Sequence, residues 1–269
     1  MVIDKYNLRA LKVNSLVCVG LDPDFDKLPE NFKTMEFPQF GFNKYIIDQT
    51  AEYVAAFKPN TASYEVRGEQ GWHELKMTAE YIQKNYPNIF TICDAKRADI
   101  GYTSELYARA ILDNLNFDAI TLHPYLGQDG IKPFLERKDK ISVILCRTSN
   151  PGAGELQDLV VQANSLPGKP LWQIIAKKVS EEWNFNHNCM LVVGATYLKE
   201  LANVRNIVGE MTLLVPGVGT QGGSVEEVLK AGLNSKKLGL IINSSKGIIF
   251  AANPAEEAKK LRDEINKYR

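Results

Sequence analysis

Short, nearly continuous apolar runs recur along the chain and predict its architecture. Valine, isoleucine and leucine fill most of their positions, without the alternation of apolar and polar residues that marks a strand with one solvated face. Such runs are typical of β-strands that are covered on both faces. They span residues 16–22, 54–60, 89–96, 118–124, 141–148, 189–196, 212–218 and 238–245.

Segments with helical spacing separate these runs. The two clearest apolar stripes comprise Trp72, Leu75, Ala79 and Ile82 in one segment, and Leu106, Ala110 and Leu115 in another. Successive strand runs begin roughly 32 residues apart on average, close to the length of one βα repeat. The pattern predicts an α/β protein, a single (β/α)8 TIM barrel over residues 1–269, and favours it over a doubly wound sheet.

One connection is longer than the others. Residues 149–169 contain several glycine and proline residues, and loops of this length in a compact domain are often functional lids. We therefore predict a lid-like loop at about 149–169, with a tolerated surface insertion as the alternative. No Pro/Ser-rich linker indicates a second domain.

Composition narrows the class of protein. The chain has 269 residues with 32 basic and 32 acidic side chains, so neither a nucleic acid nor a membrane surface is expected as a partner. No apolar stretch predicts a signal peptide or a membrane-spanning helix, which favours a cytoplasmic location. The four cysteines lie inside apolar runs and are expected to be buried thiols: Cys18, Cys93, Cys146 and Cys189.

Polar residues gather where the predicted strands end. In a barrel of this kind the active site lies at the carboxyl ends of the strands, where charged groups are costly to bury unless they are paired or used. Residues 94–99, with the sequence DAKRAD, carry the densest signal. The candidate residues on this rim are Asp22, Lys58, Asn60, Asp94, Lys96, Asp99, Thr148, Ser149, Pro216 and Lys246.

The spacing within this segment favours proton chemistry. Asp94 and Lys96 are two residues apart, which points both side chains to the same side of a strand. Lys58, on the neighbouring run, can pair with the same acids. A lysine held among carboxylates stays protonated, which suits proton donation better than Schiff-base formation. Arg97 and Ala98 fall between the members of this network and need no catalytic role.

The glycine-rich sequence PGVGTQGG, at 216–223, predicts a phosphate site. Glycines after a strand allow backbone N–H groups to approach an anion, and Ser224 with Glu227 has the spacing of a capping box at a helix start. Gln221 and Lys246 are the expected side-chain ligands. The histidines do not form a metal cluster: His73 and His187 are expected to face solvent, and His123 to make a structural hydrogen bond. No metal or cofactor is expected.

Several segments together resemble the orotidine 5′-monophosphate decarboxylase family, in its second, longer subgroup. They are VGLDPDFDKLP, FKPNTASYE, CDAKRADIGYTSELYA, RTSNPGA, PGVGTQGG and INSSKGI, and they run nearly end to end. The resemblance implies decarboxylation of orotidine monophosphate to uridine monophosphate in de novo pyrimidine biosynthesis. It also implies a homodimeric barrel that uses no metal or organic cofactor.

The resemblance also assigns roles. Lys96 would protonate C6 as carbon dioxide leaves, Asp94 would lie beside the substrate carboxylate, and Lys58 would lie between the acids and the ribose. The remaining substrate contacts would be Asp22 and Asn60 at the ribose, Thr148 and Ser149 at the pyrimidine edge, Pro216 and Gln221 in the glycine-rich loop, and Asp99, Ile100 and Thr103 reaching into the partner subunit's site. The family usually has arginine where this chain has Lys246, so weaker phosphate binding is predicted.

Other functions remain open on the residues alone. A metal-assisted sugar-phosphate decarboxylase or aldolase of a related phosphate-binding barrel shares the D-x-K-x-x-D pattern, but has no reason to carry Thr148 and Ser149 as a pyrimidine pair. A Schiff-base aldolase and a catalytically silent nucleotide-binding barrel are further alternatives.

Overall fold

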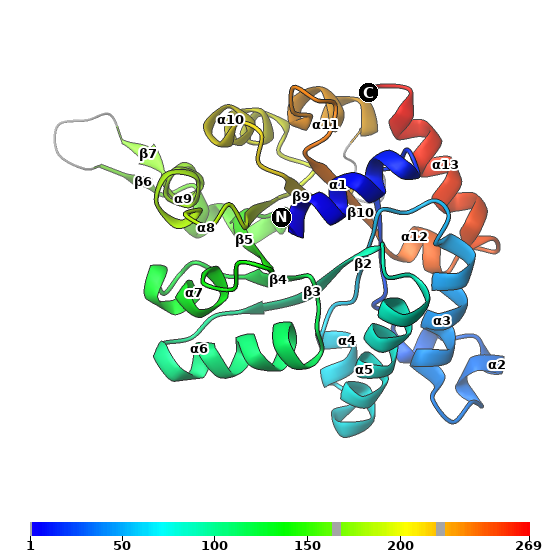
Figure 1. Ribbon diagram of the computed structural model, residues 1–269. Coiled ribbons are helices and arrows are strands. Elements are labelled where there is room, and N and C mark those ends of the chain that lie inside the picture. The colour runs from blue at the N-terminus through cyan, green and yellow to red at the C-terminus, as the bar shows by residue number, and fades with distance from the viewer. Residues whose placement is uncertain (1, 163–167, 219–223) are drawn as a thin grey trace.

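Eight parallel strands form a closed barrel in the computed structural model, which describes residues 2–162, 168–218 and 224–269 (Figure 1). Around the barrel the strands follow the order β1-β10-β9-β8-β5-β4-β3-β2. They are β1 (Val17–Gly20), β2 (Ala56–Lys58), β3 (Phe90–Arg97), β4 (Ala119–Leu122), β5 (Ile141–Arg147), β8 (Cys189–Val193), β9 (Leu213–Pro216) and β10 (Leu240–Ser244). Each falls on one of the predicted apolar runs, so the (β/α)8 prediction is confirmed.

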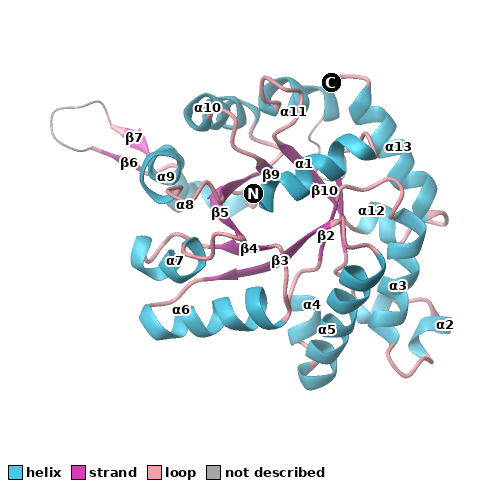
Figure 2. Ribbon diagram, viewed as in Figure 1, coloured by secondary structure: helices cyan, strands magenta, loops and turns pink. Residues whose placement is uncertain are grey.

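Helices surround the strands on the outside of the barrel (Figure 2). The main ones are α1 (Val2–Lys12), α3 (Pro38–Thr50), α5 (Gly68–Asn85), α6 (Gly101–Ala108), α7 (Gln128–Leu135), α9 (Leu171–Lys178), α10 (Leu198–Val208), α11 (Val225–Gly232) and α13 (Pro254–Asn266). Four-residue helices are α2 (Glu30–Lys33), α4 (Ala62–Glu65), α8 (Gly154–Gln157) and α12 (Lys246–Ile249). Short 3-10 turns span Phe25–Lys27 and Pro151–Ala153. Because helices cover the strands outside and side chains fill the barrel inside, β4 and β8 are buried at every residue.

The two predicted helical stripes differ in outcome. On α5 the residues Leu75, Ala79 and Ile82 are buried, although Trp72 is exposed. The second stripe was wrong at Leu106 and Ala110, which face solvent, whereas Leu115 is partly buried against the core. The core-facing residues of α6 and of the π-helical turn Arg109–Asn114 that continues it keep a regular helical spacing, but on a different face from Leu106 and Ala110. The buried residues of this helical stretch are Ser104, Ala108, Ile111 and Leu112.

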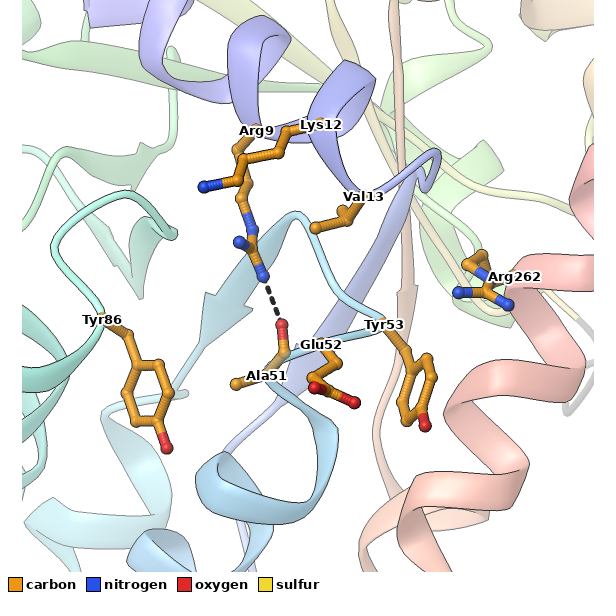
Figure 3. Close-up of a pocket in the computed structure, with 8 residues that line it drawn as sticks. All are labelled: Arg9, Lys12, Val13, Ala51, Glu52, Tyr53, Tyr86 and Arg262. Carbon is orange, nitrogen blue, oxygen red and sulfur yellow. Dashed lines mark hydrogen bonds between the residues drawn. The ribbon is translucent and has the colours of Figure 1, made fainter.

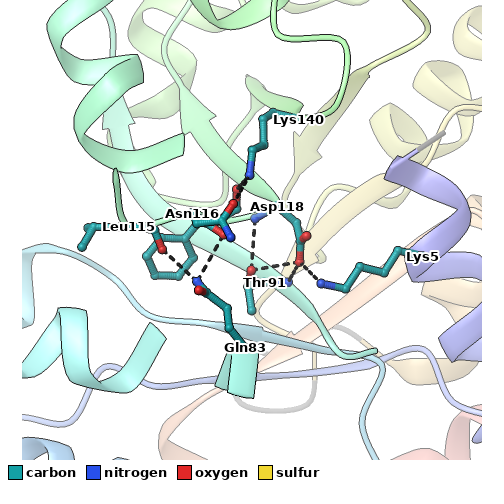
Figure 4. Close-up of polar contacts among 8 residues, drawn as sticks. Lys5, Gln83, Thr91, Leu115, Asn116, Asp118 and Lys140 are labelled. Atoms are coloured by element: carbon teal, nitrogen blue, oxygen red, sulfur yellow. Dashed lines mark hydrogen bonds and ion pairs between the residues drawn. The ribbon is translucent and has the colours of Figure 1, made fainter. Parts of the chain in front are cut away.

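Helix α1 closes the amino-terminal end of the barrel. The Tyr6 hydroxyl donates to the Leu240 carbonyl at 2.5 Å, at the start of β10. The Lys5 ammonium pairs with Asp118 at 2.6 Å, just before β4. Asp118 also accepts hydrogen bonds from the backbone N–H and the hydroxyl of Thr91, both at 2.9 Å (Figure 4). Residues 2–12 therefore fasten the starts of several strands to one another.

The long connection after β5 contains several short regular elements. It begins with the 3-10 turn and α8 and continues into the antiparallel hairpin of β6 (Val160–Val161) and β7 (Lys169–Pro170). The hairpin projects from the barrel beside α9 (Figure 1). Lid behaviour at 149–169 stays a prediction, and part of that range lies outside the described residues.

Two further expectations concern the whole chain. All four cysteines are buried and free, as predicted. Within the described ranges, no helix combines the length and the apolar character that a bilayer crossing requires.

Candidate active site

A cavity of about 460 Å³ opens at the carboxyl ends of the barrel strands. Its wall includes six of the predicted site residues, which come from β2, β3, β9 and the end of β5: Lys58, Asp94, Lys96, Thr148, Ser149 and Pro216. Three polar residues of the same wall were not predicted from the sequence: Thr121, Asn150 and Gln157. Six of the ten predicted rim residues therefore line one cavity, whereas Asp22, Asn60, Asp99 and Lys246 are not part of its wall.

Asp94 lies at the centre of the charged part of this cavity. Its Oδ1 atom is 2.7 Å from the Lys96 ammonium, and its Oδ2 atom is 3.0 Å from the Lys58 ammonium. The Thr121 hydroxyl donates to Oδ1 at 2.8 Å, and the Asn60 amide donates to Oδ2 at 3.3 Å. Two cations and two neutral donors thus fix one carboxylate from three strands and the turn after β2.

The backbone at Lys96 departs from a regular strand. Its φ angle is 46°, and the pairing of β3 with β4 shifts register between Cys93 and Arg97. A positive φ is unfavourable for a residue with a side chain, and bulges commonly redirect side chains near active sites. The Lys96 N–H donates to the Thr121 hydroxyl oxygen at 2.9 Å, which holds the bulge. Thr121 was detectable in the sequence as a hydroxyl inside an apolar run.

Burial and charge act in opposite directions on this network. Burial raises the pKa of the Asp94 carboxyl, but Lys58 and Lys96 outweigh it and hold that pKa well below its usual range. Burial lowers the pKa of the Lys58 ammonium, but the charges of Asp94 and Asp22 raise it above its ordinary value. The buried Lys58 and Asp94 therefore form a charged pair, whereas the Lys96 side chain remains 48% exposed.

Asp22 follows β1 close to the same network. Its Oδ1 atom is buried and accepts no hydrogen bond from the described part of the chain. Gly20 allows the close approach of Ser245, because a Cβ atom at Gly20 would lie 1.8 Å from the Ser245 hydroxyl oxygen. A buried carboxylate oxygen without a donor is costly unless a ligand supplies one.

The predicted phosphate region is only partly described. Lys246 is exposed at the start of α12, beside the end of β10, and Gln221 lies outside the described residues. Ser224 caps α11 by accepting the Glu227 N–H, as its spacing predicted.

Asp99, Ile100 and Thr103 do not line the cavity of their own chain. The Asp99 carboxylate accepts the Ile100 N–H at 2.7 Å, at the start of α6. Arg97, for which no catalytic role was predicted, pairs with Glu65 outside the cavity wall.

Two of the three histidines have the surroundings that were predicted, because His73 and His187 are exposed. His123 does not line the cavity, and the structural hydrogen bond expected of its side chain stays a prediction. Among the described residues, no group of three or more histidine, cysteine, aspartate or glutamate side chains is arranged to hold a metal ion.

A second pocket, of about 530 Å³, lies beside α1 and the segment between α3 and β2, and it shares no lining residue with the first cavity (Figure 3). Arg9 in this pocket donates to the carbonyls of Ala51 and Val54. Arg262 lies 5.2 Å from the ring centre of Tyr53. The two arginines thus join α1 and α13 to the segment that follows α3. The lysine–aspartate–lysine network lies at the other end of the barrel, where the strands end.

A closed (β/α)8 barrel with a lysine–aspartate–lysine array in its carboxyl-terminal mouth defines an enzyme of the barrel class. Comparison with known proteins gives the family. The sequence profile of the orotidine 5′-phosphate decarboxylase / HUMPS family matches residues 15–261, and the chain belongs to this family.

Individual relatives agree along nearly the whole chain. An orotidine 5′-phosphate decarboxylase of Flavobacterium johnsoniae is 44% identical over 99% of this chain and 95% of the relative. One from Christiangramia forsetii is 47% identical over 93% of this chain and 89% of the relative. The solved structure of Leishmania donovani OMP decarboxylase has a TM-score of 0.88 and 38% identity, covering 99% of this chain and 98% of that one.

Proposed function

We propose that this chain decarboxylates orotidine 5′-monophosphate to uridine 5′-monophosphate in de novo pyrimidine biosynthesis, without a metal or organic cofactor. The array of Lys58, Asp94 and Lys96 in one cavity is the observation that carries the proposal. The names of relatives at 44–47% identity supply the substrate.

Lys96 is the proposed proton donor. The bond between C6 and the carboxyl carbon breaks, its electron pair remains on C6, and carbon dioxide leaves. The Lys96 ammonium stabilises that negative charge electrostatically and then transfers its proton to C6, forming the new C–H bond. The neutral amine regains a proton from water, which can reach a side chain that is 48% exposed.

The neighbours of Lys96 keep it in place for this step. Asp94 holds the ammonium at 2.7 Å, and Thr121 binds both the Asp94 carboxylate and the Lys96 backbone. Lys58 balances the charge of Asp94 from the buried side. Because these groups are fixed before the substrate binds, little reorganisation is needed as charge develops.

The remaining rim residues hold the substrate in this proposal. Asp22 has an unsatisfied carboxylate oxygen, which suits a ribose hydroxyl donor, and Asn60 is adjacent to the network. Thr148, Ser149 and Pro216 form the wall for the pyrimidine ring. Gln221 and Lys246 would bind the phosphate, whose binding energy supports the rate at the distant ring.

A direct assay tests the activity. Purified protein treated with a chelator should convert orotidine 5′-monophosphate to uridine 5′-monophosphate at its untreated rate. Activity that is lost to the chelator and returns with a divalent ion would favour a metal-assisted sugar-phosphate enzyme instead. Trapping of a substrate adduct on Lys96 by borohydride would favour a Schiff-base aldolase.

A homodimer with shared active sites is also part of the proposal. Large apolar side chains are exposed at the start of α6 and before α7, with Ile100 at 62%, Tyr102 at 73% and Tyr125 at 82%. An exposed apolar group of this kind is typical of a protein interface. Since Asp99 adjoins it, the same contact would carry Asp99, Ile100 and Thr103 to the partner subunit's cavity.

Complementation tests the sharing of sites. Asp99→Ala and Lys96→Ala chains should each be inactive, and mixing them under conditions of subunit exchange should restore part of the activity. Exchange without any recovery of activity would contradict shared sites while leaving the decarboxylase assignment intact.

A further inference from the structure

A chain of hydrogen bonds runs along the cavity wall that follows β5. The Oε1 atom of Gln157 accepts the Thr148 N–H at 2.8 Å and lies 3.4 Å from the Nη1 atom of Arg147. The Nε2 atom of Gln157 donates to the Thr148 hydroxyl oxygen at 2.8 Å. That hydroxyl lies 2.6 Å from the Oδ1 atom of Asn150. A path from Arg147 through Gln157 and Thr148 to Asn150 therefore connects a buried cation to the cavity surface.

The direction of this chain is fixed by two groups that can only donate. A backbone N–H and a guanidinium both face one end of the Gln157 amide, so that end must be its oxygen. The NH₂ end then faces Thr148, whose oxygen accepts and whose single proton goes to Asn150. Thr148 consequently keeps one lone pair and no proton for a ligand, and Asn150 keeps its NH₂ group.

Arg147 holds the start of the chain firmly. Its side chain is only 2% exposed and pairs with the Asp158 carboxylate at 3.0 Å. Its guanidinium carbon lies 3.7 Å from the ring centre of Tyr197, and its Nη1 atom donates to the Thr148 carbonyl at 2.8 Å. At the end of β8, Gly194 gives the adjacent Ser149 room, because a Cβ atom there would lie 2.7 Å from the Ser149 Cβ.

We propose that Gln157 is a positioning residue that sets the hydrogen-bond polarity of this wall and thereby selects the base of the bound nucleotide. The inference rests on the proposed function and deepens it. A uracil-type edge presents an N–H beside a carbonyl oxygen, which matches the Thr148 lone pair and the Asn150 NH₂ group. A cytosine-type edge presents a bare nitrogen beside an NH₂ group, so lone pair meets lone pair and donor meets donor.

Binding of two nucleotides measures this selection. Isothermal titration calorimetry of the whole protein with uridine 5′-monophosphate and with cytidine 5′-monophosphate should show a preference of at least about 10-fold for the uridine nucleotide. In Gln157→Glu the carboxylate can still accept from Arg147 and the Thr148 N–H, but its second oxygen draws the Thr148 proton away from Asn150. The preference should fall at least about 10-fold, toward equal affinity.

Two controls distinguish a change in the hydrogen-bond polarity of the wall from a general structural defect. Gln173→Glu makes the same change on α9, outside the cavity wall, and should keep the preference. Ribose 5-phosphate should bind Gln157→Glu and the unaltered protein within about twofold of each other, because the base wall does not touch it. A structural defect would weaken ribose 5-phosphate as well.

A second variant keeps the test decisive if Gln157→Glu does not fold. Thr148→Val keeps the shape of the side chain but removes the hydroxyl, and it should lose the preference too. An unaltered protein that does not prefer the uridine nucleotide overturns the inference, as does a preference that survives in the variants that fold. If instead the nucleotide preference behaves as expected but orotidine 5′-monophosphate is not decarboxylated, only the proposed function fails.

Discussion

The two ends of the barrel contain nearly the same group of side chains. At the carboxyl end, Asp94 pairs with Lys96 at 2.7 Å and accepts a threonine hydroxyl at 2.8 Å. At the amino end, Asp118 pairs with Lys5 at 2.6 Å and accepts a threonine hydroxyl at 2.9 Å. The contacts alone do not distinguish a reactive site from a structural one.

The two sites differ in the number of lysines around the aspartate and in whether a cavity reaches those lysines. Asp118 meets one lysine, delivered by α1, and satisfies a backbone N–H as well. Asp94 meets two lysines, and one of them reaches the cavity from a bulged backbone with positive φ. Strain and excess charge in an open cavity are features of functional sites, whereas saturation of one acid by local donors is typical of structural ones.

Removing the lysine of each pair gives the largest expected contrast. Lys96→Ala should reduce kcat for decarboxylation by at least about 1000-fold, because it removes both the proton donor and the cation beside C6. Lys5→Ala should leave kcat within about twofold of the unaltered protein, since its side chain lies at the far end of the barrel. Initial rates at saturating substrate measure both, and near-parental turnover in Lys96→Ala would rule out the donor assignment.

A substitution at the amino end should instead lower the stability of the protein and leave its activity unchanged. Asp118→Ala removes the acceptor for Lys5 and for the N–H and hydroxyl of Thr91, so the free energy of unfolding should fall by about 2–3 kcal/mol. Urea denaturation followed by circular dichroism measures this change. Activity per folded molecule should not change, and a loss of kcat comparable to that of Lys96→Ala would show that the two ends are not separate in function.

The dependence of the free energy of unfolding on acid pH tests the charge stabilisation of Asp94. The Asp94 carboxyl has a lower pKa in the folded protein than in the unfolded chain, where it is about 3.9. Its ionised form therefore contributes stability that is fully present above the unfolded pKa and is lost as pH falls through the folded pKa. Below about pH 4, the free energy of unfolding should fall less steeply with decreasing pH in Asp94→Asn than in the unaltered protein.

Urea denaturation at a series of pH values between about 2 and 6 measures this difference. Lys58 remains buried without its carboxylate partner in Asp94→Asn, so this variant should be less stable at neutral pH. The gap between the two proteins should close as the pH falls. Parallel curves would mean that Asp94 does not gain its charge stabilisation from folding.

The sequence predicted the features that depend on neighbouring residues along the chain. Continuous apolar runs gave all eight barrel strands, because strands covered on both faces have no polar side to interrupt them. The spacing of Asp94 and Lys96 placed them together, although their contact occurs at a bulge rather than in a regular strand. The resemblance to a family supplied the expected roles of these residues. The barrel fold places Lys58 against the same Asp94 carboxylate.

Features that depend on distant contacts were not visible in this way. Gln157 reaches Thr148 from a four-residue helix inside the segment predicted as a loop, and no local pattern indicates that contact. Two faces of the helical stretch 101–115 carry apolar residues, and packing on the barrel buries Ala108 and Ile111 rather than Leu106. The role of α1 as a closure of the barrel comes from Lys5 and Tyr6, whose partners are more than 100 residues away.

The smallest expected effect concerns Lys246, where the resemblance to the family implies an arginine. Lys246→Arg should strengthen the binding of uridine 5′-monophosphate by up to about 10-fold, because a planar guanidinium can donate two parallel hydrogen bonds to a phosphate and an ammonium cannot. Titration calorimetry measures the affinity, and uridine, which lacks the phosphate, should bind both proteins equally. Lys236→Arg makes the same change at an exposed position before β10, on the amino side of the barrel, and should have no effect. Equal gains for uridine and its monophosphate would place the action of residue 246 away from the phosphate, and no gain at all would mean that the lysine already meets the need of the site.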